Sequence, residues 1–444
     1  MAAKTKKPPK RRKPIAKEDP QPSEEKNATG KRLKIEGLKY FATLRPMLDH
    51  LHDDHCERDK AGNRKLHYDQ YCMLILLYVL NPTVSSLRSL SQASELTKVR
   101  KKLGTDKVAI GSLSEASRLF DADRLKEIVS GLSAQVQTTH VDKRLDDVPG
   151  TLTAVDGSLV NALPSMIKAS ILKQTCGSGV VRWRLHTHFE VGNHVPSRID
   201  VTPNGGGADD ERAMMKRVVE SDRLYVMDRG YVKLPLFNDI VASKSSYACR
   251  LRDNTICEVV EQRELTDGDR AADVMSDQIV LLGKASSNSD SPDHAVRLVE
   301  VRCTPHQNRT GGKAKHSTAP NSDGILRIAT NLLDVPAEII ALIYSYRWTI
   351  EIFFRFYKQL MGGAHLISHA ENGIEIQVYC SMIACLLINL WTGTKPNKRT
   401  FEMICFYFQG LASEDELLAH IEKQKQAAEA KREKAAEKEA ENNC

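Results

Sequence analysis

The chain has 444 residues, enough for two or three domains and a large buried core. Its composition, 41% hydrophobic and 27% charged residues, excludes a globally disordered protein. The net charge of +7 is unevenly placed, because residues 1–34 hold 12 Lys and Arg against 4 Asp and Glu, which leaves the rest of the chain close to neutral. Any attraction to a polyanion through net charge is therefore concentrated at the N-terminus.

The N-terminal arm, residues 1–35, is rich in Lys, Arg and Pro and poor in apolar residues, which predicts disorder. It is interpreted either as a solubilising tail or as an arm attracted to DNA phosphate, with nuclear targeting a further role in a eukaryotic host. No apolar segment closely follows it, so no signal peptide is predicted. The 10 cysteines form no CxxC pair, which favours a reduced, cytoplasmic protein.

Residues 36–148 are predicted to be helical, from apolar residues at helical spacing such as those of 68–80. Helical domains of this size often bind DNA, which makes DNA binding a hypothesis for this region. Within it, residues 49–59, "DHLHDDHCERD", are dense in potential metal ligands. Their spacing matches no zinc pattern with a second ligand pair downstream, so a metal site here is the weaker interpretation.

From about residue 150 the pattern changes to short strands that alternate with helices. Apolar runs predict strands at 152–156, meeting a turn at Gly157–Ser158, and at 223–228, 246–252 and 326–332. Strict alternation over 181–191 predicts a strand with one buried face, and His186 and His188 are assigned to its open face. These elements indicate an α/β core, which strand-like segments among polar residues interrupt between 253 and 322.

Residues 334–361 are predicted to form one long helix, and 376–391 a buried helix too short and polar for a membrane span. At 100° per residue, the charged residues of the long helix fall with one phenol on a single stripe of about 80°. The members of this stripe are Tyr344, Arg347, Glu351, Arg355 and Lys358. A line of i,i+4 salt bridges on a solvated face is one explanation of it, and a site that binds metal and phosphate is the other.

Two predicted strands end in an aspartate followed at once by turn residues, "TAVDGS" at Asp156 and "YVMDRGY" at Asp228. Either one alone is explained by a turn or a helix cap. Together with Glu351 they form a set of three carboxylates, which repel one another unless a cation neutralises them. Hard oxygen ligands favour Mg²⁺ or Mn²⁺, and two such ions can promote displacement at phosphorus.

The spacing Y-x2-R-x3-E-x6-K over residues 344–358 resembles the YREK signature of the DDE transposases of bacterial insertion sequences, of the IS-four type. "DGS" at Asp156 and "DRGY" at Asp228 are similar to that family's first and second acid motifs. The resemblance covers about residues 150–392. It implies an RNase H-like catalytic core in which Asp156, Asp228 and Glu351 are catalytic and bind two Mg²⁺ or Mn²⁺ ions. It also implies that Tyr344, Arg347 and Lys358 contact DNA.

The family resemblance further implies cut-and-paste transposition, with double-stranded DNA bearing terminal inverted repeats and target DNA as partners. A homodimer is expected in the active complex, and the expected location is cytoplasmic, at the nucleoid. A metal-dependent nuclease on the same core and an inactive DNA-binding relative are the alternatives. The predicted organisation is a basic arm (1–35), a helical, DNA-binding domain (36–148), the first part of the core (149–252), a β-rich insertion (253–323), the second part of the core with the Glu-bearing helix (324–395) and a charged helical tail (396–444).

Overall fold

The computed structural model describes most of the chain beyond the basic arm. The described residues are 41–52, 59, 64–136, 142–161, 182–203, 210–283, 291–303, 324–362, 366–368, 370–392 and 397–442. Residues 36–444 form one compact unit. The predicted arm, 1–35, lies outside the described residues, and the domain bounds given above stay predictions.

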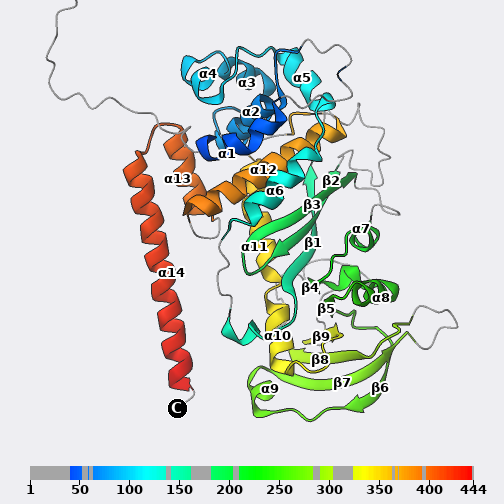
Figure 1. The fold of residues 1–444 in the computed structure, drawn as a ribbon. Coiled ribbons are helices and arrows are strands. Elements are labelled where there is room, and N and C mark those ends of the chain that lie inside the picture. The colour runs from blue at the N-terminus through cyan, green and yellow to red at the C-terminus, as the bar shows by residue number, and fades with distance from the viewer. Residues whose placement is uncertain are drawn as a thin grey trace, which may run out of the picture. The chain divides into compact units, whose positions relative to one another are not determined.

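The N-terminal part is helical, as its apolar spacing predicts. The helices, with one 3₁₀ turn near their start, are α1 (Phe41–Leu48), η1 (Asp49–Leu51), α2 (Tyr68–Leu80), α3 (Leu87–Ala93), α4 (Thr97–Leu103), α5 (Ile110–Leu119) and α6 (Arg124–Ser133). Helices α2, α5 and α6 pack against α12 (Glu371–Thr392), so helices from distant parts of the sequence share one hydrophobic core (Figure 1). Among the described residues only α12 has the length and hydropathy of a membrane span, and 89% of its apolar window is buried inside the protein.

A nine-stranded mixed sheet follows in the order β3-β2-β1-β4-β5-β9-β8-β7-β6 (Figure 1). Strand β4 runs parallel to β1 and β5 runs parallel to β4, whereas the other neighbours are antiparallel. The strands are β1 (Thr151–Asn161), β2 (Arg182–Glu190), β3 (Val195–Pro203), β4 (Arg223–Met227), β5 (Ser246–Arg250), β6 (Cys257–Gln262), β7 (Val274–Leu282), β8 (Val296–Arg302) and β9 (Ile325–Thr330). The β-rich insertion thus extends the sheet of the core, since its strands β6, β7 and β8 continue from β9.

Helices cover both faces of the central strands. On one face α7 (Glu211–Arg217) and α8 (Leu234–Ala242) pack against Tyr225 and Met227 of β4, and on the other α10 (Ala337–Ser345) packs against Leu224 and Val226. Strand β4 is buried on both sides for this reason, and its sequence "RLYVM" is almost continuously apolar. The ends of β4 and its neighbour β1 are therefore held rigidly, which fixes any side chain placed there.

Two predictions for the first strands are wrong. Gly157 and Ser158 form no turn, because β1 continues through them and pairs them with His186 and Leu185 of β2. His186 and His188 do not lie on an open face, since both are buried, at 5% and 3% exposed. His186 accordingly contacts the Thr202 hydroxyl at 2.8 Å, and burial lowers the pKa of His188 to about 3, so His188 is a neutral core residue.

The predicted helix over 334–361 is two helices rather than one. Helix α10 ends at Ser345, a turn occupies Tyr346 and Arg347, and α11 (Trp348–Gly362) begins after it. The stripe computed for one straight helix consequently does not apply across the turn. Instead, the turn separates Tyr344, which is buried with the core of α10, from Arg347 and Glu351.

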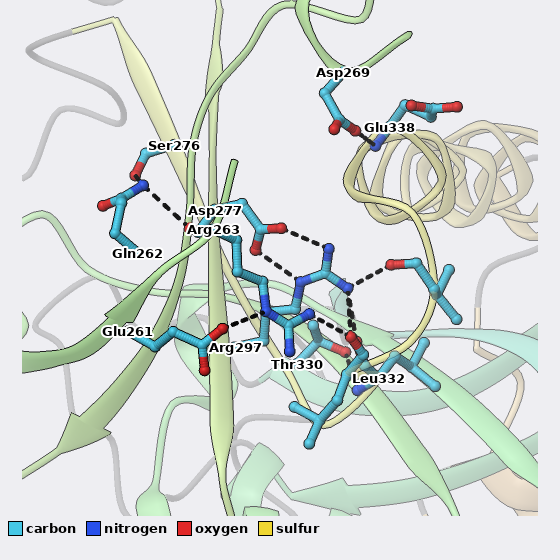
Figure 2. A network of polar contacts seen from close by, with 12 residues as sticks. Glu261, Gln262, Arg263, Asp269, Ser276, Asp277, Arg297, Thr330, Leu332 and Glu338 are labelled. Atoms are coloured by element: carbon cyan, nitrogen blue, oxygen red, sulfur yellow. Dashed lines mark hydrogen bonds and ion pairs between the residues drawn. The ribbon is translucent and has the colours of Figure 1, made fainter. Parts of the chain in front are cut away.

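A buried ionic network fixes the start of α10 to the inserted strands (Figure 2). The guanidinium of Arg297 on β8 binds the carboxylate of Asp277 on β7 through two bonds of 2.7 and 2.8 Å. It also donates to the carbonyls of Leu332, Leu333 and Val335 in the segment that leads into α10. The insertion therefore positions the helix pair that carries Arg347 and Glu351.

The C-terminal part is helical, with α13 (Lys398–Phe408) and α14 (Glu414–Asn442). Helix α14 has a charged sequence, as predicted for the tail, and it joins the main core near its start through Leu417 and Ile421.

Candidate active site

Asp156 lies where β1 parts from β4. The parallel pairing of these strands ends at Val155 and Met227, and the next residue of β1 is Asp156, while the next residue after β4 is Asp228. The two aspartates therefore lie at the same level, Asp228 directly after the end of β4 and Asp156 inside β1, which continues to Asn161. The strand end predicted at Asp156 is thus wrong, because pairing with β2 extends β1 beyond it. The Asp156 carboxylate accepts a hydrogen bond from the Gly157 amide at 2.7 Å, and its side chain is 22% exposed.

Asp228 also begins a short turn. It is the N-cap of η5 (Arg229–Tyr231), and its carboxylate accepts from the Gly230 amide at 2.7 Å. The capping role that a single aspartate suggests is thus real. Asp228 has this capping role and also lies beside Asp156.

Burial and charge act together on this carboxylate pair. Burial, and next the charge of Asp228, raise the pKa of Asp156 to about 7, although the Gly157 amide and Arg347 oppose the rise. The charged form of Asp156 is therefore destabilised in this protein. A hard divalent cation bound to the carboxylate would offset that cost by supplying positive charge.

Arg347 lies between Asp156 and Glu351. Its Nη2 is 2.7 Å from Glu351 Oε1 and its Nη1 is 3.9 Å from Asp156 Oδ2. Glu351 therefore lies at the edge of the site, where it forms an ion pair with Arg347. Within the described part of the chain, no three His, Cys, Asp or Glu side chains are gathered closely enough to hold a metal ion.

The other residues of the predicted stripe differ in their surroundings. Tyr344 is 7% exposed, and burial raises the pKa of its phenol while the nearby Arg347 opposes the rise. Lys358 is exposed on α11. Arg355 stacks its guanidinium over the exposed Trp348 ring at 5.6 Å, a contact that the sequence pattern did not predict.

A further carboxylate, Glu211, was missed by the sequence analysis. It opens α7 and binds Arg184 of β2, with 2.7 Å between Arg184 Nη1 and Glu211 Oε1. Burial raises the pKa of Glu211, Arg184 opposes the rise, and Asp228 adds to it, which places the residue near the aspartates. Only the acidic start of a helix at "DDER" marks it in the sequence, a feature that most helices share.

The His- and Asp-rich segment 49–59 is described in part, since residues 53–58 lie outside the described residues. His52 contacts Asp69 at 3.0 Å and stacks on His67, with 3.8 Å between the ring centroids. These contacts account for His52 as a structural residue.

The sheet and the site define an α/β protein with a carboxylate pair at the divergence of two parallel strands. The chain belongs to the family described as Transposase DDE domain, whose model matches residues 149–388. The resemblance to DDE transposases of insertion sequences is confirmed by this match. The IS-four type and its YREK signature stay predictions.

Relatives of this chain carry the names of transposases. It is 24% identical to a protein of Sinorhizobium fredii named as transposase y4zB, over 53% of this chain and 61% of the relative. It is 24% identical to the probable transposase for insertion sequence element IS5377 of Geobacillus stearothermophilus, over 43% of this chain and 45% of the relative. It is 23% identical to a protein of Synechocystis named as a transposase for insertion sequence element IS4SA, over 70% and 78% of the two chains. The first two matches thus span less than two thirds of the relatives' own length.

Proposed function

We propose that this protein is a DNA transposase that cleaves and joins DNA strands at transposon ends by a cut-and-paste DDE mechanism. The observation that carries the proposal is that Asp156 and Asp228, within the matched family domain, directly follow the last paired residues of the adjacent parallel strands β1 and β4. The relatives' names point to the same activity, with insertion sequences as the mobile elements.

We propose an RNase H-like core for the catalytic part. The strand order β3-β2-β1-β4-β5 supports it, with β1 to β3 antiparallel and β4 and β5 parallel to β1. In this arrangement the aspartates come from two central strands, and the helix pair α10 and α11 brings Glu351 from the far end of the domain.

The proposed cofactor is a pair of Mg²⁺ or Mn²⁺ ions, held by Asp156, Asp228 and Glu351. The donor set fits, because three carboxylates suit a hard cation and because burial and the Asp228 charge, which raise the pKa of Asp156, are offset by a bound cation. Held there, the ions would supply activation of an attacking hydroxyl or water and stabilisation of the leaving oxygen. The carboxylates would have to be ionised to bind them.

Arg347 is proposed to exchange partners when DNA binds. Its guanidinium pairs with Glu351 and faces Asp156 in the free protein. Arginine can bind a DNA phosphate through two parallel hydrogen bonds, whereas Arg347 donates one hydrogen bond to Glu351. We propose that Arg347 moves to phosphate, and that Glu351 is thereby released to complete the cation site.

The roles proposed for Lys358 and Tyr344 in DNA binding follow from how exposed each side chain is. Lys358 is exposed, and it is proposed to bind phosphate as a point charge. The buried Tyr344 is proposed to act near the reacting end by supporting Arg347, whose charge already acts on its phenol. Terminal inverted repeats, target DNA, a homodimer in the active complex and a cytoplasmic, nucleoid-associated location complete the proposal.

A strand-transfer assay tests this function. The full chain is incubated with Mg²⁺ and labelled DNA that carries the inverted repeats flanking its gene, and the products are separated on a denaturing gel. Cleaved ends together with joined products support a transposase. Cleavage without joining would favour a nuclease instead, and binding with neither product would favour an inactive DNA-binding relative.

A further inference from the structure

Glu211 is a carboxylate that the proposed set of three acids does not use. It is the first residue of α7, and the start of this helix is fixed because the Asp210 side chain accepts a hydrogen bond from the Ala213 amide at 2.7 Å. The Glu211 side chain is 26% exposed. Its position next to the aspartates is therefore set by the fold.

The absence of a side chain at Gly157 makes room for the Glu211 carboxylate. A methyl group added to Gly157, the residue after Asp156, would lie only 2.2 Å from Glu211 Oε1. One added to Gly230, in the turn that Asp228 caps, would lie 3.7 Å from Glu211 Oε2, an ordinary contact distance. The Glu211 carboxylate therefore occupies the space that Gly157 leaves open beside Asp156, and it also lies close to the turn at Asp228.

A buried phenol reports the same convergence. Tyr231 is 1% exposed, and burial together with the charges of Glu211, Asp156 and Asp228 raises its pKa well above the usual value. All three carboxylates therefore lie close enough to the Tyr231 hydroxyl to act on it, which agrees with the contact at Gly157.

Each of the two glutamates beside the aspartate pair forms an ion pair with an arginine. Glu351 is paired with Arg347 and Glu211 is paired with Arg184, each at 2.7 Å. In the free protein an arginine thus neutralises each flanking glutamate. A divalent cation at the aspartates would compete with these arginines for the glutamate oxygens.

We propose that Glu211 is a fourth carboxylate of the cation site, a ligand that joins Asp156 and Asp228 when a divalent cation binds. The inference rests on the proposed function, because that function requires the cation. It adds a residue that the three-acid pattern of the sequence does not contain.

The test measures binding of Mn²⁺ alone to the full chain, by the electron paramagnetic resonance signal of the free ion. Glu211→Gln is expected to weaken Mn²⁺ binding by about 10- to 100-fold, as loss of a supporting or direct ligand does. Glu300→Gln is the matched control, since Glu300 is 23% exposed and also pairs with an arginine, Arg327, in the inserted strands. Equal affinities for the two variants would overturn the inference.

A second variant tests the glycine space. Gly157→Ala should displace the Glu211 carboxylate and weaken Mn²⁺ binding, and it should cause no further loss in a Glu211→Ala background. Independent, additive losses would contradict the proposed contact.

Asp156→Asn distinguishes loss of the whole cation site from loss of the Glu211 ligand alone. If the wild type binds no Mn²⁺, or if Asp156→Asn leaves its affinity unchanged, the cation site of the proposed function fails and Glu211 fails with it. If Asp156→Asn loses affinity but Glu211→Gln does not, only the inference about Glu211 fails.

Discussion

Replacing Arg297 by alanine should destabilise the sheet and loosen the helix pair of the active site. Arg297 is 3% exposed and its partner Asp277 is 6% exposed, so the variant would leave a carboxylate buried without its cation. The carbonyls of Leu332 and Val335 would lose a donor as well, whereas Leu333 would keep Arg263. Removing one partner of a buried ion pair costs about 3–5 kcal/mol, which sets the expected loss in the free energy of unfolding.

Denaturant unfolding followed by circular dichroism measures this loss. Arg327→Ala is the control, because its pair with Glu300 is about one-fifth exposed and should contribute about 1 kcal/mol or less. The double variant Arg297→Met, Asp277→Leu should recover most of the stability, since it removes both charges together. A loss for Arg297→Ala no larger than that for Arg327→Ala would refute the reasoning.

Three further predictions concern the site and the charges. Because the pKa of Asp156 is raised from 3.8 to about 7, the folded protein holds this proton more tightly than the unfolded chain, so this group's contribution to stability falls as pH rises between these values, by at most about 4 kcal/mol. In chelator, Asp156→Asn should therefore raise the melting temperature more at pH 8 than at pH 5, and an equal change at both would contradict the assignment. Lys358→Ala should weaken binding to DNA of any sequence and lower the salt slope by about 1, whereas Lys423→Ala, an exposed lysine of α14, should not. Deletion of residues 1–34 should flatten the salt dependence of DNA binding, and an unchanged slope would make the arm a solubilising tail.

The central strands of the fold and the aspartate pair are the features best predicted from sequence. Short apolar runs before Asp156 and Asp228 predict the two strands, and parallel pairing of β1 with β4 places the aspartates at the same level. The strand end is predicted correctly only at Asp228, since β1 continues past Asp156. The extension of β1 through Gly157 is not predictable in this way, because pairing with β2 overrides the local preference of glycine for turns.

Local sequence patterns also fail to predict the positions of side chains that depend on contacts between distant parts of the chain. The 100° periodicity assumes a straight helix, and it cannot register the turn at Tyr346 and Arg347 that directs Arg347 between Asp156 and Glu351. The alternation over β2 predicts that one face of the strand is buried. In the structure the other face is buried as well, and His186 and His188 lie on it. The position of Glu211 depends on the contact of a helix start with the distant Gly157, and no spacing rule predicts that contact.

The most direct test of the transposase assignment is the dependence of strand transfer on the three acids. With Mg²⁺ and transposon-end DNA, Asp156→Asn, Asp228→Asn and Glu351→Gln should each abolish joined products, while DNA binding persists and Glu300→Gln retains wild-type yield. Wild-type yields of joined products from any of the three variants would contradict the assigned role of that residue. Wild-type yields from all three would contradict the carboxylate mechanism itself.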